Sequence, residues 1–266
     1  MAPDAAVVHR SPAAFLRSRR TGRADSRRTV VFVGDSITRG VVSSNWIEAV
    51  ARRHGHRPID FVNAGVNGDL AFNVAARLDE VVECRPDAVT LLIGTNDVQA
   101  TYSERMERMF RRQNGLRSPP TLASYRSAVS EILEIVHRRT SARIAVIEIP
   151  MIGEDLGSPM NEKVDAYNVV LRALAEERGD DVLPIRAGLE RLLTSGRTPP
   201  PYTADISLIV KASLAHGILR RSWNDISSRN GLEVLTDQVH LNDRAGAVIA
   251  KAVSVFVERL SQGHGQ

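Results

Sequence analysis

The sequence has one cysteine in 266 residues, Cys84, so no disulfide can form within the chain. A small disulfide-stapled scaffold is excluded, and a reducing compartment is favoured. The sequence also lacks an apolar run near the roughly 18 residues that a membrane-spanning helix needs. Residues 1–28 lack the apolar core, about 7–15 residues long, of a secretory signal. We therefore expect a cytoplasmic protein without a transmembrane segment. An organellar presequence stays open, because this start is rich in arginine and poor in acids.

Basic charge is largely absent from the body of the chain, although the whole chain carries a net charge of +4. Residues 1–28 hold seven arginines and two acidic residues, a net charge of +5, which leaves −1 for residues 29–266. A nucleic-acid-binding domain carries its basic charge on the folded surface that meets phosphate. We therefore expect no specific nucleic-acid partner, and we interpret residues 1–28 as a basic, flexible tail.

Residues 29–262 fit one large globular domain, since the chain is 43% hydrophobic and 25% charged. Short apolar runs alternate there with segments of helical periodicity. The predicted strands are 29–34, 59–64, 88–93, 143–149 and 181–185, and the predicted helices are 44–54, 70–84, 121–139, 161–178 and 243–260. This alternation predicts an α/β fold in which helices cover both faces of a parallel sheet.

Small polar residues follow the first three predicted strands. These segments are GDSIT (34–38), NAGVNGD (63–69) and GTND (94–97), and a fourth, DQVH (237–240), precedes the last predicted helix. Functional residues of such sheets gather at the carboxyl ends of the strands. We therefore expect the four segments to lie together.

The residue types in these segments suit acyl transfer. A serine hydroxyl is a weak nucleophile and needs a positioned base, most often a histidine. The histidine in turn needs a carboxylate that holds its tautomer and stabilises its charged form. Hydrogen-bond donors must also face the oxyanion of the tetrahedral intermediate. The backbone amide of Ser36, a glycine amide of the second segment and the Asn96 side chain could supply them.

The four segments, taken in order, resemble the SGNH hydrolase family, also called GDSL-type lipases and esterases. The resemblance implies Ser36 as the nucleophile, His240 as the base and Asp237 as the residue that orients it. It also implies an oxyanion hole built from Ser36, Asn96 and a glycine.

The family's fold is a flavodoxin-like, three-layer α/β/α sandwich with a five-stranded parallel sheet. No metal or organic cofactor is implied. Gly68 fits the family's second block better than Gly65, because a polar residue and then a helix follow it. Ile37 stands where the family most often has leucine.

Other functions must be weighed against this interpretation. A metallophosphoesterase needs clustered histidine and aspartate ligands, and the histidines required near the first strand and beside Asn96 are absent. An α/β-hydrolase with a G-x-S-x-G elbow is disfavoured, since that motif does not occur. An acyltransferase on the same scaffold stays open because it would share these residues. A non-catalytic binding protein is the third alternative, which the intact set of residues opposes.

Two insertions interrupt the alternation, at 100–120 and 194–222. Met106, Met109 and Phe110 have helical spacing in the first, and they either pack against the domain or line an acyl pocket. In the second, an amphipathic helix over 206–219 is expected to cover the core rather than to act as a lid. The substrate class expected is a small-molecule, lipid or carbohydrate ester, and the sequence leaves the oligomeric state open.

Overall fold

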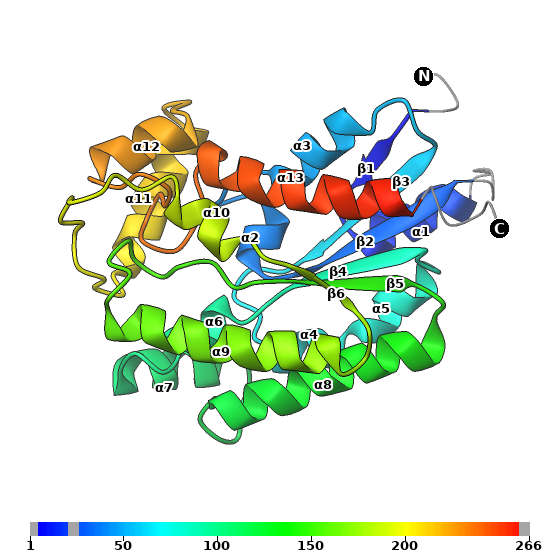
Figure 1. Ribbon diagram of the computed structural model, residues 1–266, viewed down its shortest axis with the longest axis horizontal. Coiled ribbons are helices and arrows are strands. Elements are labelled where there is room, and N and C mark those ends of the chain that lie inside the picture. Colours follow the sequence, from blue (N-terminus) through cyan, green and yellow to red (C-terminus); the bar gives the residue numbers. More distant parts are fainter. Residues whose placement is uncertain (1–4, 21–26, 261–266) are drawn as a thin grey trace.

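A six-stranded parallel sheet forms the centre of the computed structural model, which describes residues 5–20 and 27–260 (Figure 1). The spatial order is β1-β3-β2-β4-β5-β6. The strands are β1 (Val7–His9), β2 (Arg28–Gly34), β3 (Ile59–Gly65), β4 (Ala88–Leu92), β5 (Arg143–Ile147) and β6 (Asp181–Leu183). Gly34, at the end of β2, is in register with Gly65 of β3 and with Leu92 of β4. The segments that follow these three strands therefore leave the sheet side by side.

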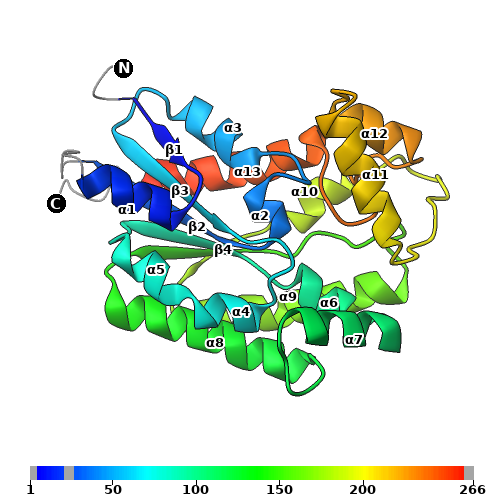
Figure 2. The ribbon, with the colours of Figure 1, turned by 180° about the vertical axis from the view of Figure 1, so that it is seen from behind.

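Helices cover both faces of the sheet, as Figures 1 and 2 show from opposite sides. One face packs against α1 (Pro12–Arg20), α4 (Ala71–Ala76), α5 (Leu78–Glu83), α8 (Leu122–Arg139) and α9 (Pro159–Glu176). The other packs against α3 (Trp46–Arg53), α10 (Arg186–Glu190) and α13 (Asp243–Arg259). Neighbouring residues of β2 alternate between the two cores, with Val31 in the first and Phe32 in the second. The predicted three-layer α/β fold is confirmed.

The N-terminal segment differs from the flexible tail predicted by its arginine content. Residues of β1 pair with β3, which adds a sixth strand to the five expected, and Phe15 of α1 is fully buried in the core. The basic charge is partly matched inside the fold, because Arg27 contacts Asp60 through Nε and Oδ2 at 3.2 Å. Parts of the predicted tail (1–4 and 21–26) and the predicted domain end at 262 lie outside the described residues.

One predicted helix, 70–84, is two helices. They meet at Arg77, which separates α4 from α5. The Arg77 guanidinium donates to the carbonyl oxygens of Gly34 and Ala64, at 3.1 and 2.8 Å, and to the Asp69 carboxylate at 2.7 Å. Arg77 thus ties together the ends of the two strands that carry the first two polar segments.

The remaining helices of the described chain gather at the carboxyl edge of the sheet. They are α2 (Ser36–Arg39), α6 (Thr95–Gln99), α7 (Glu104–Gln113), α11 (Ile206–Gly217) and α12 (Trp223–Arg229). Helix α11 does not cover the core as expected, since Ala212 is its one buried residue and Val210 and Leu214 are more than half exposed. Ala212 packs instead on Trp223 and Ile226 of α12, in a small separate cluster.

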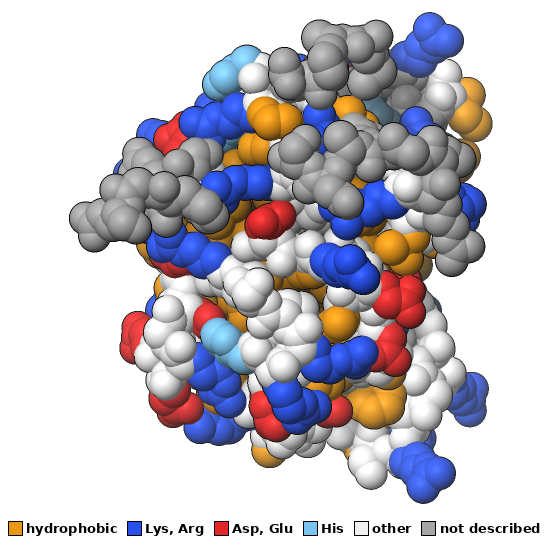
Figure 3. All heavy atoms as spheres, turned by 90° about the vertical axis from the view of Figure 1, so that its right-hand side faces the viewer, with side chains coloured by type: hydrophobic (Ala, Val, Ile, Leu, Met, Phe, Trp, Pro, Cys, Tyr) orange, Lys and Arg blue, Asp and Glu red, His pale blue; other side chains and the backbone are white. Residues whose placement is uncertain are grey.

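The opposite end of the molecule, where the strands begin, shows basic and acidic side chains interspersed over its described surface (Figure 3). Among the described residues, no helix combines the length and apolar character needed to cross a bilayer.

Candidate active site

Ser36 lies where β2 passes into α2. Asp35 is the N-cap of this helix, and its Oδ1 accepts a hydrogen bond from the Ile37 amide at 2.9 Å. Ser36 is the first residue of the helix, so its N–H has no acceptor within the helix. Gly34 must lack a side chain, because a Cβ there would lie 2.3 Å from the Leu92 carbonyl oxygen. Close packing and capping together fix the serine at the edge of the sheet.

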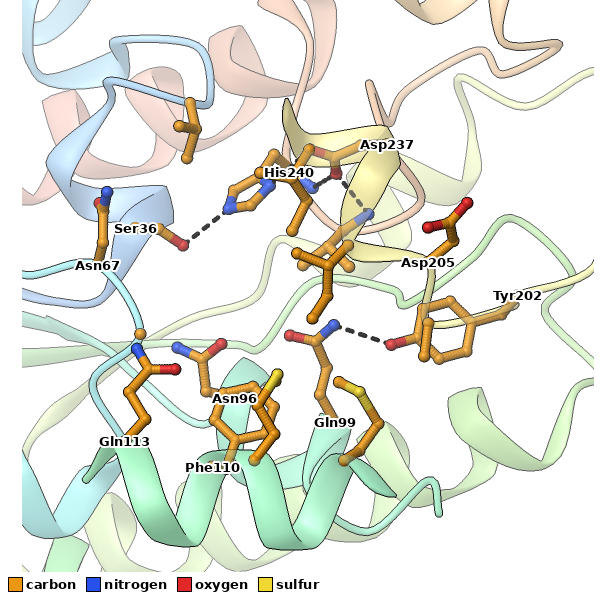
Figure 4. A pocket seen from close by; sticks show the side chains of 18 residues that line it. Ser36, Asn67, Asn96, Gln99, Phe110, Gln113, Tyr202, Asp205, Asp237 and His240 are labelled. Carbon is orange, nitrogen blue, oxygen red and sulfur yellow. Dashed lines mark hydrogen bonds and ion pairs between the residues drawn. The ribbon is translucent and has the colours of Figure 1, made fainter. Parts of the chain in front are cut away.

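A continuous chain of hydrogen bonds joins Ser36 to His240 and Asp237 (Figure 4). Ser36 Oγ lies 2.8 Å from His240 Nε2, and His240 Nδ1 lies 2.8 Å from Asp237 Oδ2. The other oxygen, Oδ1 of Asp237, accepts from the backbone amides of Val239 and His240 at 3.1 and 2.9 Å. The loop before α13 therefore orients the carboxylate, which in turn orients the imidazole.

The electrostatics of this pair favour an ion pair. Burial alone would lower the pKa of His240, but the Asp237 carboxylate outweighs it and raises that pKa above the ordinary 6.5. Burial alone would raise the pKa of Asp237, but His240 and the backbone amides hold it below the ordinary 3.8. Asp237 stays ionised and His240 becomes a stronger base.

Two candidate hydrogen-bond donors, Gly68 and Asn96, line the same cavity as Ser36. Gly68 adopts a left-handed conformation (φ +81°), which a residue with a side chain rarely takes. The Asn96 side chain donates to the Asp69 carbonyl oxygen at 2.9 Å and has a second N–H to offer. Both residues line one cavity with Ser36, whereas a Cβ on Gly65 would lie 2.4 Å from the backbone nitrogen of Arg39. Gly68 lies at the site, and Gly65 serves the packing of α2 on β3.

Two further acids of the sequence segments are buried behind the site. Burial raises the pKa of Asp35 and that of Asp97 to about 7. Asp97 accepts a hydrogen bond from the Ala71 amide at 3.1 Å, so it fixes the start of α4. Asp35 and Asp97 each accept a hydrogen bond from a backbone amide at the start of a helix, so both have a structural role.

The cavity has a volume of about 230 Å³ and contains all the predicted site residues. It is lined by the predicted Ser36, Gly68, Asn96, Met106, Met109, Phe110, Asp237 and His240, and also by Val42, Asn67, Gln99, Gln113, Tyr202, Ala204, Asp205, Ile206, Ile209 and Val239. Met106 and Phe110 of α7 are buried and belong to a small apolar cluster with Leu70. They both pack against the domain and face the cavity.

Tyr202 and Gln99 are lining residues that the sequence did not single out. The Gln99 amide donates to the Tyr202 hydroxyl at 2.8 Å (Figure 4). Gln238, between Asp237 and His240, donates to the Pro201 carbonyl oxygen at 2.6 Å and accepts from the Thr203 amide at 3.1 Å. Its φ of +75° is unusual for glutamine. These contacts attach the second insertion to both sides of the site.

Glu154 lies outside the four sequence segments, and no sequence motif singles it out. It is buried, and its carboxylate accepts from the amides of Glu233, Val234 and Leu235 at 2.8–3.0 Å. Arg197 contacts the same carboxylate at 3.0 Å. Glu154 therefore fixes the chain just ahead of Asp237. No local pattern could have indicated this role, because its partners are about 80 residues away.

The chain matches known proteins over most of its length. Residues 32–245 match the GDSL-like Lipase/Acylhydrolase family. The acetylxylan esterase of Geobacillus stearothermophilus is 25% identical over 215 residues, covering 74% of this chain and 93% of that protein.

Solved structures share the fold. A catalytic mutant of an acetylxylan esterase from Geobacillus stearothermophilus aligns with a TM-score of 0.62 at 17% identity, over 88% of this chain and 94% of the other. An α/β hydrolase enzyme from the metagenome of Lake Arreo, Spain, aligns with a TM-score of 0.58 at 18% identity, over 88% and 96%.

The family match agrees with the resemblance that the four sequence segments carry. The matched range begins within β2 and ends after the DQVH segment, so it contains every residue of the hydrogen-bonded chain described above. The protein therefore belongs to the GDSL-like Lipase/Acylhydrolase family and is a carboxylic ester hydrolase.

Proposed function

We propose that this hydrolase is a serine esterase that works through an acyl-enzyme intermediate, with Ser36, His240 and Asp237 as its catalytic triad. The observation that carries the proposal is the hydrogen-bonded chain of the three side chains, with Oγ–Nε2 and Nδ1–Oδ2 distances of 2.8 Å each. The three side chains line a cavity that Gly68 and Asn96 also line. The nucleophile, base and orienting carboxylate have the geometry that acyl transfer requires.

The first half-reaction acylates the enzyme. Ser36 Oγ forms a bond to the ester carbonyl carbon while His240 Nε2 takes its proton and the carbonyl π electrons move onto oxygen. The amides of Ser36 and Gly68 and the Asn96 side chain stabilise this oxyanion. The intermediate collapses, the carbon–oxygen bond to the alcohol breaks, and the alcohol leaves with the proton from His240. Asp237 stabilises the imidazolium throughout.

The second half-reaction frees the enzyme. His240 takes a proton from water as the water oxygen bonds to the acyl carbon. The new tetrahedral intermediate expels Ser36 Oγ, which regains its proton from His240, and the carboxylic acid leaves. If an alcohol replaces water in this step, the same residues carry out acyl transfer, which is the alternative function.

The relatives support the choice of residue types. The structures from Geobacillus stearothermophilus include catalytic mutants in which an aspartate, a serine or a histidine is replaced by alanine. Those proteins are acetylxylan esterases, and the matching family is described as lipases and acylhydrolases, so we take a carbohydrate or lipid ester as the substrate class of this chain.

Hydrolysis of nitrophenyl acetate, butyrate and octanoate by the purified protein tests the proposal. The wild type should release nitrophenol, and Ser36→Ala should lose roughly 10³-fold or more in kcat. Equal rates for the two proteins would overturn the proposal. Added glycerol or methanol separates hydrolysis from transfer, because a transferase forms a new ester at the expense of the free acid.

A further inference from the structure

Apolar side chains form two facing walls of the active-site cavity. On one side, Met106 and Phe110 of α7 are one helical turn apart and are each 4% exposed. On the other side, Ile206 and Ile209 come from the first turn of α11. Val42 and Val239 add to this lining. The space between α7 and α11 is therefore suited to an apolar group.

The polar groups of the cavity lie near Ser36 or make at least one hydrogen bond within the protein. Figure 4 places Asn67 beside Ser36, and Gln113 approaches Gly68 at the oxyanion side. Farther away, Gln99 and Tyr202 hydrogen-bond each other at 2.8 Å. The Asp205 carboxylate accepts from the Ser207 amide and hydroxyl, at 2.9 Å each. Each of these three side chains is thus held by a hydrogen bond within the protein, whereas the lining between α7 and α11 consists of apolar side chains.

The apolar lining continues outside the cavity along α11. Ile206, Val210 and Leu214 are spaced at i, i+4 and i+8, so they share one face of the helix. Their side chains are 40%, 54% and 52% exposed. Exposed apolar side chains aligned on one helix face are a common feature of surfaces that bind apolar groups. This stripe starts at a cavity-lining residue, Ile206, so it extends the same binding surface.

We propose that the acyl group of the substrate is an apolar chain longer than acetyl, which lies between α7 and α11. Chains too long for the cavity leave it along the stripe of Ile206, Val210 and Leu214. This inference rests on the proposed function, because it concerns the acyl group that Ser36 accepts. It departs from the acetyl esters named for the relatives, since an acetyl group would leave the two apolar walls unfilled.

A series of nitrophenyl esters with acyl chains of two, four, eight and twelve carbons tests this proposal at concentrations below micelle formation. Each buried methylene contributes about fourfold. Octanoate has more methylenes than acetate, and burial of even about two of them should raise kcat/KM by about tenfold or more. Ile209→Trp, which fills the space between the walls, should lower this octanoate-to-acetate ratio by about tenfold. A thermal melt checks that the variant is folded.

The stripe is tested by a charged substitution at an exposed position. Val210→Asp should lower the laurate-to-acetate ratio by about fivefold or more, because it places a carboxylate where the end of the chain lies. Val169→Asp is the matched control. Val169 is a 57% exposed valine on α9, and it does not line the cavity. Its substitution should leave the ratio unchanged.

The outcomes separate the two proposals. An acetate preference, or ratios that neither Ile209→Trp nor Val210→Asp changes, would overturn the acyl-chain proposal while the esterase stands. A second series, of acetate esters with alcohols of increasing chain length, gives a further test. If kcat/KM rises with the alcohol chain and not with the acyl chain, the proposal is also overturned, because the chain then binds on the alcohol side. Undiminished hydrolysis by Ser36→Ala would instead overturn the proposed function.

Discussion

The carboxylate of Glu154 accepts a hydrogen bond of 2.9 Å from the backbone amide of Leu235, two residues before Asp237. It also accepts from the two preceding amides, Glu233 and Val234. A buried carboxylate that satisfies three consecutive amides holds the backbone in one conformation. The position of the orienting aspartate therefore depends on a residue outside the four sequence segments.

Glu154→Ala should destabilise the protein by about 3 kcal/mol or more, because each buried amide left without an acceptor costs roughly 1–3 kcal/mol. It should also lower kcat more than it changes KM, since Asp237 loses its support. Glu154→Gln keeps an acceptor oxygen, so its stability and its kcat should fall between those of the wild type and those of Glu154→Ala. Chemical denaturation and steady-state kinetics measure both effects.

Asp155→Asn is the control, since this neighbouring acid is exposed. If Glu154→Ala matches Asp155→Asn in both stability and kcat, Glu154 does not position the catalytic loop.

The pH profile of kcat/KM should have an acidic limb. His240 must be neutral to accept the proton of Ser36, and the Asp237 carboxylate raises the pKa of His240 above 6.5 even though burial opposes it. Activity should therefore rise with pH through a midpoint above 6.5. In Asp237→Asn the raising charge is absent, so the midpoint should move to lower pH and kcat should fall by roughly 10³-fold or more. A midpoint that is the same in both proteins would assign the limb to another group.

Asp97 should make the protein less stable as the pH rises. Burial raises the pKa of Asp97 from 3.8 to about 7, so the folded state holds this proton more tightly than the unfolded state. Its stabilising contribution is fully present below pH 3.8 and is lost as the pH rises through about 7. Asp97→Asn cannot ionise but keeps an acceptor for the Ala71 amide.

Between pH 5 and pH 8 the stability of Asp97→Asn relative to wild type should therefore increase by about 2–3 kcal/mol. Urea denaturation at both pH values measures it. A constant difference between the two proteins would show that Asp97 is already ionised in the folded state at pH 5.

The two glycines of the second segment should respond differently to substitution. Gly68→Ala places a side chain at φ +81° and against Gln113, so it should shift the Gly68 amide and lower kcat by about tenfold or more. Gly65→Ala forces a Cβ against the Arg39 backbone, so its main effect should be a lower Tm. A fully active Gly68→Ala protein would remove Gly68 from the oxyanion hole.

The sequence predicts the features that depend on local patterns. Apolar runs locate five strands of the sheet, β2 to β6, and the glycine, serine and asparagine at strand ends locate the polar edge. The sixth strand is missed because β1 has three residues and pairs with β3 about 50 positions away, amid arginines that suggest a solvated tail. The bond between Glu154 and Leu235 is also long-range, and nothing near Glu154 indicates it.

The second insertion shows that hydrophobic periodicity predicts a helix but not what its apolar face contacts. The spacing of Ile206, Val210 and Leu214 correctly predicts an amphipathic helix, but the usual inference that the apolar face is buried is wrong. Whether such a face contacts the core, the cavity or solvent depends on how the loop before it is anchored. Here Gln99 and Gln238 provide that anchor, at Tyr202 and at its neighbours Pro201 and Thr203.

The central claim is that Ser36 is the nucleophile, and covalent labelling tests it most directly. The protein is treated with a fluorophosphonate probe, and the modified peptide is identified by mass spectrometry. The account predicts one adduct on Ser36, with labelling abolished in Ser36→Ala and strongly slowed in His240→Ala, because the base is missing. An unlabelled Ser36 in an enzyme that still hydrolyses esters, or an adduct on another residue, would contradict it.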